Sequence, residues 1–282
     1  MSTLQSPPAS STTKASEPVR RQRGGENRWT NASLGLAGVL VVIALEELLT
    51  RTGVIDPDYL PPFTTILQSL GELLKDPDFW QSFAQTLRGW AIGLALAMII
   101  GVAAGLVIGS VPVLKEFTAS TIEFLRPIPS VALIPLVVLM FGTSPQSSIV
   151  LVVYAAVWQV LVQVLYGVAD VDPVARDTAR SYRFSRLTTA RTVVWPTALP
   201  YVVTGFRLAA AVALVLEVTA ELVIGVPGLG RDIGVAQSSN AVAKTYALVI
   251  VVGLIGLAIN LAARLVERRV LSWHPSVRRF AA

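Results

Sequence analysis

Long stretches without a charged residue constrain this chain more than any other feature of its sequence. Residues 89–109 and 245–263 contain no Asp, Glu, Lys or Arg, and neither does the segment between Arg126 and Asp170. A helix that crosses a bilayer needs about 20 mostly apolar residues, so each stretch can hold at least one crossing. Turn-forming residues at 142–148 divide the longest stretch into two. The sequence therefore predicts an all-α integral membrane protein.

Six transmembrane helices are predicted in all. One further apolar run ends in Glu46 and Glu47, and another contains Arg207, Glu217 and Glu221. The six predicted spans cover residues 34–49, 89–109, 118–142, 149–169, 205–225 and 245–263.

Two of these spans carry features beyond their hydropathy. Glycines recur in the second span, mostly at four-residue spacing, which predicts close packing against a neighbouring helix. The third span contains Pro127, Pro129 and Pro135, and proline removes a helix hydrogen bond. In lipid the freed carbonyls must face protein or water. The third span is therefore predicted to be kinked. The kink is either a structural feature alone or a broken helix that faces a cavity or a partner subunit.

The charges between the spans predict the orientation. Residues 1–30 carry five basic and two acidic residues, a net charge of +3, and 170–191 carry five and three, a net +2. From Arg264 onward there are five arginines and one glutamate, a net +4. The loop 51–83 has two basic and five acidic residues, a net −3. Six spans place the basic segments on one side, which the positive-inside rule makes cytoplasmic.

The acidic outer loop contains a helix signal of its own. Ile66, Leu70 and Leu73 share one face of a predicted helix that follows Pro61 and Pro62. This amphipathic helix is predicted to lie on the bilayer surface or to be a docking surface for an external partner, and the two interpretations are compatible.

The composition excludes several classes of function. Only 15% of the residues are charged, against about 25% in an ordinary soluble domain. The chain has no cysteine and one histidine, His274, so thiol catalysis, disulfides and multi-histidine metal sites are excluded. The P-loop sequence G-x-x-x-x-G-K-[ST] is absent, so ATP must be bound by another polypeptide. No catalytic residue, metal ligand or cofactor is predicted here, and the net charge of +5 needs no nucleic-acid partner, because basic residues beside a membrane attract anionic headgroups.

The most informative segment lies on the predicted cytoplasmic side, at residues 172–200. Asp172 is a helix cap and Pro173 suits the first turn that follows. A short amphipathic helix is predicted there, then a break, then a second helix that ends at Trp195-Pro196, before the next span begins. The ordered pattern favours docking onto a partner over a solvated loop.

This segment resembles the EAA loop in permease subunits of type I ABC importers. The resemblance is carried by residues 177–183, followed by Trp195-Pro196 and Ala198-Leu199-Pro200. Three further matches are similar to permeases for nitrate, taurine and alkanesulfonates. They are residues 126–142, Thr219-Ala220-Glu221 with Gly228-Leu229-Gly230, and Glu267-Arg268-Arg269 with Trp273-His274-Pro275. Together the matches cover most of residues 60–275.

The resemblance implies a fold, a location and partners. The fold would be the MetI-like core of a type I ABC importer permease, a multi-pass protein of the bacterial inner (plasma) membrane with both termini cytoplasmic. The partners would be a second copy of the chain, an ATPase subunit homodimer that binds ATP and Mg²⁺, and an extracytoplasmic substrate-binding protein. The 174–186 helix would sit in a cleft of the ATPase and transmit its closure to the spans. The implied coupling residues are Arg176, Asp177, Thr178, Ala179, Arg180, Tyr182, Arg183 and Ser185.

The chain departs from the family pattern within this loop. Asp177, Thr178 and Trp195 replace the family's Glu, Ala and Leu. Arg183 replaces a glycine that permits a tight turn. We expect Arg183 to turn with a negative φ, to adopt a strained conformation, or to contact the partner directly.

Charged residues inside a bilayer are candidates for function. Glu217 and Glu221 lie four residues apart and share a helix face. Either they find cationic or backbone partners, or they line a translocation path. The predicted path residues are Glu217, Glu221, Gln159, Gln163 and Met140. Two carboxylates would repel an anion unless they are protonated or paired. The solute therefore stays open between a sulfonate-, taurine- or nitrate-like anion, a cation or zwitterion, and a small heterocycle or vitamin precursor.

The chain is predicted to divide into four parts. They are a flexible basic cytoplasmic arm (1–30), the first transmembrane helix with the external amphipathic helix (31–83), the transmembrane core with its coupling loop at 170–196 (84–266), and a basic cytoplasmic tail (267–282).

Two other functions are alternatives to that of an ABC permease. An ATP-independent secondary carrier or channel would need no docking loop, and its spans often show inverted repeats; no internal repeat is evident here. A membrane-embedded enzyme would need a nucleophile or metal ligands within the spans. The sequence has no G-x-S-x-G, no H-E-x-x-H and no histidine in a span.

Overall fold

The computed structural model describes residues 28–272, and over that range its regular structure is entirely helical, which confirms the predicted class. The elements in chain order are α1 (Arg28–Arg51), α2 (Phe63–Leu73), α3 (Pro77–Ser110), α4 (Pro112–Leu125), η1 (Ser130–Leu133), α5 (Ile134–Phe141), α6 (Pro145–Ala169), α7 (Pro173–Ser181), α8 (Arg186–Thr189), η2 (Ala190–Val194), α9 (Trp195–Ile224), α10 (Leu229–Ser238) and α11 (Val242–Val270). Most of the predicted arm, much of the predicted tail and the Trp273-His274-Pro275 match lie outside the described residues.

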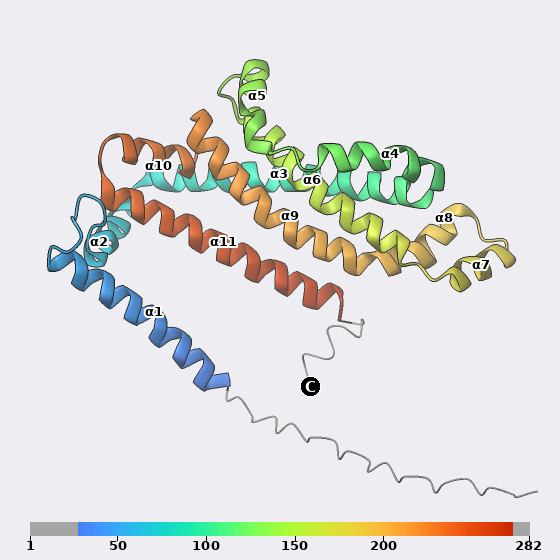
Figure 1. Ribbon diagram of the computed structural model, residues 1–282, viewed down its shortest axis with the longest axis horizontal. Helices are drawn as coiled ribbons and strands as arrows, with labels where there is room; N and C mark the ends of the chain where they lie inside the picture. Colours follow the sequence, from blue (N-terminus) through green and yellow to red (C-terminus); the bar gives the residue numbers. More distant parts are fainter. Residues whose placement is uncertain (1–27, 273–282) are drawn as a thin grey trace, which may run out of the picture.

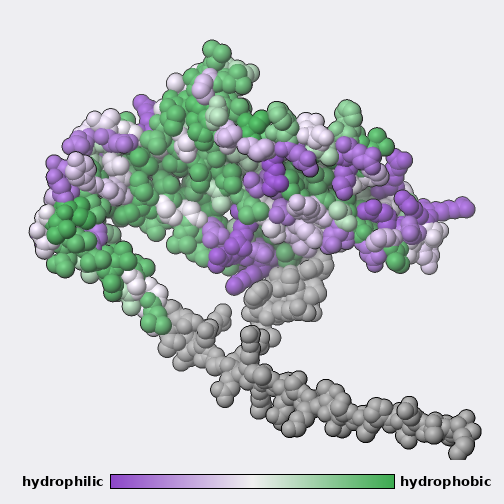
Figure 2. Space-filling view, in the orientation of Figure 1, coloured by the Kyte–Doolittle hydropathy of each residue, from purple (hydrophilic) through white to green (hydrophobic). Residues whose placement is uncertain are grey.

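Five helices are long and apolar enough to cross a membrane, and a sixth crossing is present if the bent pair α4 and η1–α5 forms one span. Figure 2 shows hydrophobic residues over α1 and around α5, whereas hydrophilic residues gather near α7 and α8. Helices α3, α6 and α9 form the centre of the molecule (Figure 1). We call the side where α3 and α6 begin the α10 end, and the opposite side the α7 end.

The predicted glycine packing joins α3 to α6. Glycines 93, 101, 105 and 109 on α3 lie against valines 152, 160, 164 and 168 on α6. A Cβ atom built on Gly101 would lie 2.7 Å from the Cβ of Val160, so only glycine allows this approach. Because the paired residues advance together along both helices, α3 and α6 run in the same direction. The chain must therefore return between them, and α4, η1 and α5 make that return.

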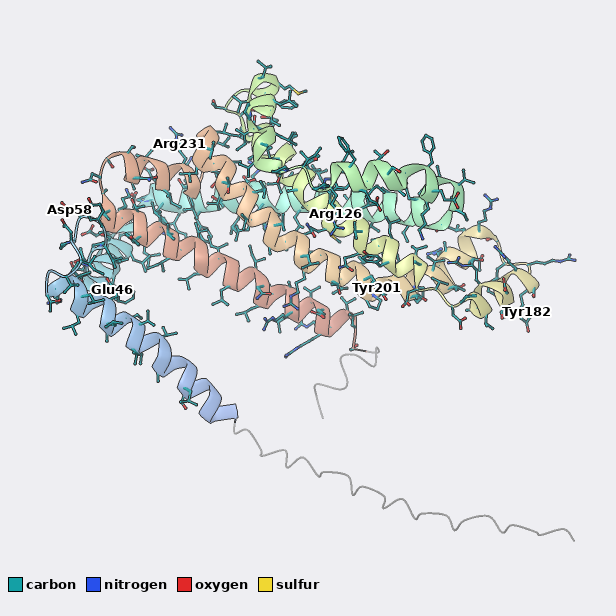
Figure 3. All side chains as sticks on the ribbon, viewed as in Figure 1. Glu46, Asp58, Arg126, Tyr182, Tyr201 and Arg231 are labelled. Atoms are coloured by element: carbon teal, nitrogen blue, oxygen red, sulfur yellow. The ribbon has the colours of Figure 1, made fainter. Side chains whose placement is uncertain are left out.

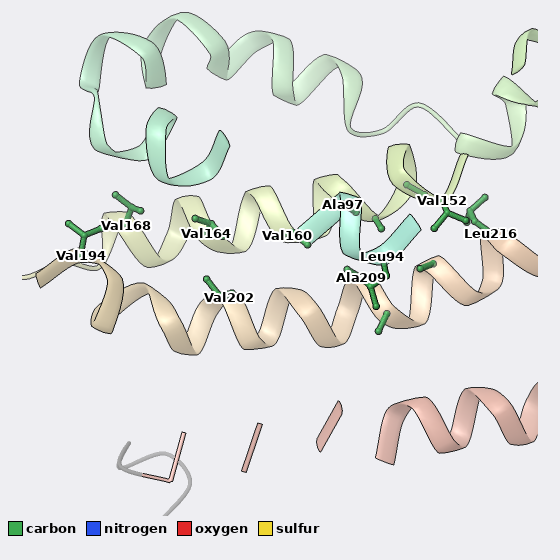
Figure 4. Packing of buried hydrophobic residues seen from close by; sticks show 14 of the residues in the cluster. Leu94, Ala97, Val152, Val160, Val164, Val168, Val194, Val202, Ala209 and Leu216 are labelled. Atoms are coloured by element: carbon green, nitrogen blue, oxygen red, sulfur yellow. The ribbon is translucent and has the colours of Figure 1, made fainter. Parts of the chain in front are cut away.

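Helix α9 packs against α6 in the opposite direction. Gly167 of α6 lies against Ala198 and Tyr201, whereas Gly205 of α9 lies against residues 159, 160 and 163 of α6. Figure 4 shows α6 and α9 side by side, with buried residues of both helices and of α3 in one hydrophobic cluster. Burial of this apolar surface between helices gives the core a fixed register.

The third predicted span, residues 118–142, is not one helix. Helix α4 begins at Pro112 and ends at Leu125, and η1 with α5 then continues at an angle of 82° to it. The break falls where two prolines flank Ile128, because proline cannot donate to the preceding turn and the residue before it is biased away from the helical region. Tyr154 of α6 donates a hydrogen bond of 2.9 Å to the Leu125 carbonyl at the end of α4. The predicted kink is confirmed, and the prediction of a single helix is wrong.

The remaining helices surround one side of this core. Ile66 and Leu73 of α2 are buried in a cluster with Leu248 and Val251 of α11, so protein covers part of the amphipathic face that was predicted to lie on a bilayer. Helix α1 lies apart from the core and is attached near α2 (Figure 1). Helix α1 begins at Arg28, three residues inside the predicted arm.

Candidate functional site

Helix α7 forms as its sequence predicts. The Asp172 side chain accepts a hydrogen bond of 2.8 Å from the Val174 N–H, and Pro173 begins the helix. The cap satisfies a backbone donor that the first helical turn cannot pair, and proline has no N–H to pair there. Nine residues of the coupling segment are thereby held as a helix at one extremity of the molecule.

Side chains of α7 attach this helix to the core of the molecule. The Arg176 guanidinium donates to the Val168 carbonyl of α6 at 3.2 Å. Ala179 is buried, and its helix face is the one that meets the protein. Tyr201 of α9 donates to the Asp170 carboxylate at 3.0 Å, which joins α9 to the start of the same loop. The Arg176 bond therefore joins α7 to α6, and the Tyr201 bond joins α9 to the first residue of the loop that carries α7.

Arg183 adopts the strained conformation that was one of three expectations. Its φ is +55°, in the left-handed region that favours glycine. The Phe184 N–H donates to the Ala179 carbonyl and the Arg183 N–H to the Arg180 carbonyl, both at 2.9 Å. This pair of bonds is a Schellman ending, in which the residue after the C-cap is left-handed. The turn that the family makes with glycine is therefore kept with arginine.

The other coupling residues divide between contact with the protein and exposure. Tyr182 is 76% exposed and lies at the far α7 end (Figure 3). Asp177 and Arg180 are exposed and form an ion pair of 3.4 Å. Ser185 accepts a hydrogen bond from the Thr188 N–H and so caps α8. The exposed members of the predicted set are Asp177, Thr178, Arg180, Tyr182, Arg183 and Ser185.

The segment after the loop differs from its prediction. No break separates the second short helix from the next span at Trp195-Pro196, because α8, η2 and α9 follow one another without interruption. The five residues before Trp195 form a π-helical turn, and Pro196 then occupies the first turn of α9, where its missing N–H costs nothing. The loop is thus continuous with a helix that runs through the core.

At the α10 end, Glu221 joins three helices. Its side chain has no exposed surface, and its Oε2 accepts hydrogen bonds from the Gly230 N–H at 2.9 Å and from the Thr86 hydroxyl at 3.0 Å. The Thr86 hydroxyl in turn accepts from the Leu229 N–H at 2.9 Å. A Cβ atom on Gly228 would collide with the carboxylate. A carboxylate at a helix N-terminus is favourable, so Glu221 fixes the start of α10 against α3 and α9. The Gly230 N–H is thus a backbone partner of Glu221, one of the two alternatives that the sequence left open for the glutamates.

We expect Thr86→Val to lower the melting temperature of the purified protein. The change leaves the buried Leu229 N–H without its acceptor, at a cost of about 1–3 kcal/mol, and it removes one of the two hydrogen bonds to Glu221 Oε2. Thr219→Val is the matched control, because that hydroxyl donates to the Val215 carbonyl of its own helix. Equal melting shifts in the two variants would show that the Glu221 contacts are not what stabilises this end.

Glu217 borders a cavity, whereas Glu221 joins neighbouring helices through hydrogen bonds. Its Oε1 accepts a hydrogen bond of 3.1 Å from the Ser148 hydroxyl, and Gly89 of α3 leaves room for the carboxylate. A cavity of about 380 Å³ lies beside it, between α3, α6 and α9. Arg88 lines the same cavity, but sequence reasoning did not select it. Arg88 stands directly before the uncharged stretch 89–109, so in the sequence it marks the boundary of a predicted span. Helix α3 in fact begins at Pro77, which places Arg88 within the helix.

The other predicted path residues do not gather around Glu217. Gln159 and Gln163 are half-buried on α6, where both lie against Gly205 of α9. Met140 lies on α5 and is 66% exposed. Glu221 is enclosed by α3 and the start of α10. The structure therefore brings Glu217 together with Arg88, Gln85 and Gln146 rather than with the other four.

Comparison with known proteins places these features in a family. Residues 97–272 match the family model described as "Binding-protein-dependent transport system inner membrane component". The chain is 29% identical to the taurine transport system permease protein of Escherichia coli over 258 residues, which cover 89% of this chain and 94% of that protein. It is 30% identical to the bicarbonate transport system permease protein of Synechococcus elongatus over 250 residues, which cover 84% of this chain and 89% of that protein.

Solved structures agree on the fold. An inward-facing methionine ABC transporter matches with a TM-score of 0.58 at 20% identity, covering 68% of this chain and 96% of that chain. A bacterial ABC transporter that imports the acidic polysaccharide alginate matches with a TM-score of 0.59 at 16% identity, covering 87% of this chain and 99% of that chain. With a family model matched over more than half of its length, the chain belongs to the binding-protein-dependent transport system inner membrane components, the permease subunits of type I ABC importers.

Proposed function

We propose that this chain forms the translocation path of an ATP-driven importer for a small solute, and that α7 couples it to a separate ATPase. The observation that carries the proposal is the exposed α7 loop, which lies inside the family match and is bonded to both α6 and α9. A secondary carrier has no need of such a loop. The sequence contains no P-loop, so in this proposal the partner binds and hydrolyses ATP.

The orientation follows from charge. The loop at the α7 end carries a net +2, whereas the loop 51–83, part of which forms α2 near the α10 end, carries a net −3. The positive-inside rule then places α7 in the cytoplasm, where an ATPase would meet it, and α10 outside. Both termini would be cytoplasmic with six spans, which requires that α4 and η1–α5 together cross once.

The proposed partners fit the surfaces that the structure offers. A substrate-binding protein would deliver solute at the α10 end. A second copy of the chain and lipid would cover the apolar side chains exposed on α4 and α5, among them Phe117 (83% exposed), Phe124 (70%) and Leu139 (84%). Such large exposed apolar groups are expected in lipid or at an interface between subunits.

The names of similar permeases indicate the general class of solute. Those similar to this chain are named for taurine, aliphatic sulfonates, bicarbonate and nitrate. All four contain a small oxyanion group. We propose a solute of this size that carries such a group.

Reconstitution tests the function. The full chain is purified with the ATPase and binding protein encoded beside it and placed in proteoliposomes, with radiolabelled taurine, an alkanesulfonate, bicarbonate and nitrate offered in turn. We expect uptake of at least one solute that requires ATP on the ATPase side and stops when the ATPase lacks its P-loop lysine. Uptake that persists without ATP would support the secondary carrier instead.

A further inference from the structure

The cavity beside Glu217 has the chemistry of a binding site. Its volume is about 380 Å³, within the usual range for small-molecule sites. Three polar side chains line it besides Glu217: Gln85 and Arg88 from α3, and Gln146 from the first turn of α6. The walls between them are apolar, from Ile92, Ile149 and the 226–227 loop. One cationic and two amide side chains thus line one small space, and the buried Glu217 carboxylate lies at its wall.

Glu217 is incompletely satisfied by the protein. The side chain is 2% exposed, and its Oε1 is bonded to Ser148. Its Oε2 is buried and accepts no hydrogen bond from the part of the chain that the structure describes. A buried carboxylate without a partner is strongly unfavourable, and acidic residues in a membrane almost always face a partner or a polar cavity. A cationic donor at this oxygen would supply both the hydrogen bond and the opposite charge.

Arg88 supplies the opposite charge in the same space. It is exposed, and none of the ion pairs found between residues 28 and 272 includes it. Guanidinium binds oxyanions in a two-point geometry. The neighbouring residue Gly89 lets the Glu217 carboxylate approach α3, so the two charges line one cavity from adjacent helices.

A second pocket toward the α10 end shares lining residues with this cavity. This pocket of about 280 Å³ shares Gln85 and Pro227 with the cavity and is also lined by Asp78, Arg231 and Asp232. Arg231 is labelled in Figure 3 on α10. A solute released at the α10 end would meet this pocket first.

We propose that this cavity is a transient site for the transported solute, and that the solute it selects is a small zwitterion. Arg88 would bind the oxyanion, and Glu217 would bind a protonated amine. A simple monoanion would satisfy Arg88 but leave Glu217 unpaired and repelled. The inference rests on the proposed import function and narrows its solute class.

Matched pairs of ligands test the inference. The full chain in lipid nanodiscs is titrated with labelled taurine and with isethionate, which keeps the sulfonate but has a hydroxyl in place of the amine. β-Alanine and 3-hydroxypropionate form a second pair around a carboxylate. We expect at least one zwitterion to bind at least tenfold more tightly than its hydroxy counterpart.

Two variants locate the discrimination. Glu217→Gln is expected to reduce the tenfold preference to within about twofold, a loss of roughly 1 kcal/mol or more, whereas Arg88→Gln weakens both members of a pair about equally. Glu116→Gln, an exposed carboxylate on α4, is the matched control. Melting curves show which variants are folded, and Ser148→Ala, which keeps the carboxylate, should retain the preference.

Three results would overturn the inference. They are an unchanged preference in folded Glu217→Gln, tighter binding of the monoanions by the wild type, and no zwitterion binding by a chain that still supports ATP-driven uptake. The last result leaves the import function standing and removes only this site. Identical effects of Glu217→Gln and Arg88→Gln on both members of each pair would show that the two residues form an ion pair of their own instead.

Discussion

Tyr182→Glu and Asp177→Arg are each expected to lower ATP-driven uptake at least tenfold while leaving the subunit folded. Both side chains are exposed at the α7 end, Tyr182 at 76%, so their loss costs the isolated chain little. The ion pair of Asp177 with Arg180 is exposed at both ends and contributes little to stability. A tenfold loss corresponds to about 1.4 kcal/mol of lost contact with the ATPase, which an exposed interface residue can supply.

The measurement is the initial rate of ATP-dependent uptake in proteoliposomes, with the melting temperature and the ATPase rate recorded beside it. Arg268→Glu on α11, outside the loop, is the control, because it changes the charge by two units as Asp177→Arg does, in the negative direction of Tyr182→Glu. Uncoupling would appear as continued ATP hydrolysis without uptake. Normal uptake by both α7 variants would remove this helix from the coupling path.

The second large effect is expected from Gly105→Leu. A Cβ atom at this position would lie 2.7 Å from the Cβ of Val164, and the helix backbones leave no space for a further side chain. Forcing a larger group into a packed contact typically costs about 1–3 kcal/mol, and here α3 would also have to move away from α6 along its whole length. We expect little folded protein to be recovered.

Gly253→Leu is the control, because a Cβ atom there meets nothing within 4 Å. Both variants add the same side chain to an apolar stretch of a long helix. Yield of monodisperse protein and melting temperature are compared for the two. If Gly105→Leu and Gly253→Leu behave alike, the parallel packing of α3 on α6 is not what holds the core together.

Local signals allowed much of this structure to be predicted. Asp172 and Pro173 define the start of α7 from adjacent residues alone, and the structure confirms both. The glycine spacing of α3 predicted close packing, because a helix repeats its faces about every four residues. The partner helix was not predictable, since valines some 59 positions later can face any of several helices.

The sequence did not predict the contacts between distant residues, or the π-helical turn that lets the chain stay helical at a proline. Glu221 meets Thr86 across 135 residues of sequence, so the pairing leaves no local trace. The bend between α4 and η1–α5 has a proline signal, but its 82° angle depends on how α5 packs beyond the break. At Trp195-Pro196 the proline suggested a stop, and the π-helical turn before it let the helix continue. Arg88 was overlooked because it stands at the edge of an uncharged run.

Arg183 shows where a family pattern and a backbone requirement can separate. The Schellman ending needs a left-handed residue, and glycine adopts that conformation at least cost. Arginine at φ +55° makes the same two hydrogen bonds, at an expense of about 1–2 kcal/mol for a side chain in that region. The arginine side chain is exposed there, which leaves its charge available to a partner.

Co-purification tests the central claim most directly. The tagged full chain is expressed with its neighbouring reading frames, extracted gently and isolated, and the proteins that accompany it are identified by mass spectrometry. We expect an ATPase that contains a P-loop to be recovered with the wild type and lost with Tyr182→Glu, while the chain itself stays folded. Recovery of the chain alone, together with solute uptake that needs no ATP, would contradict the account.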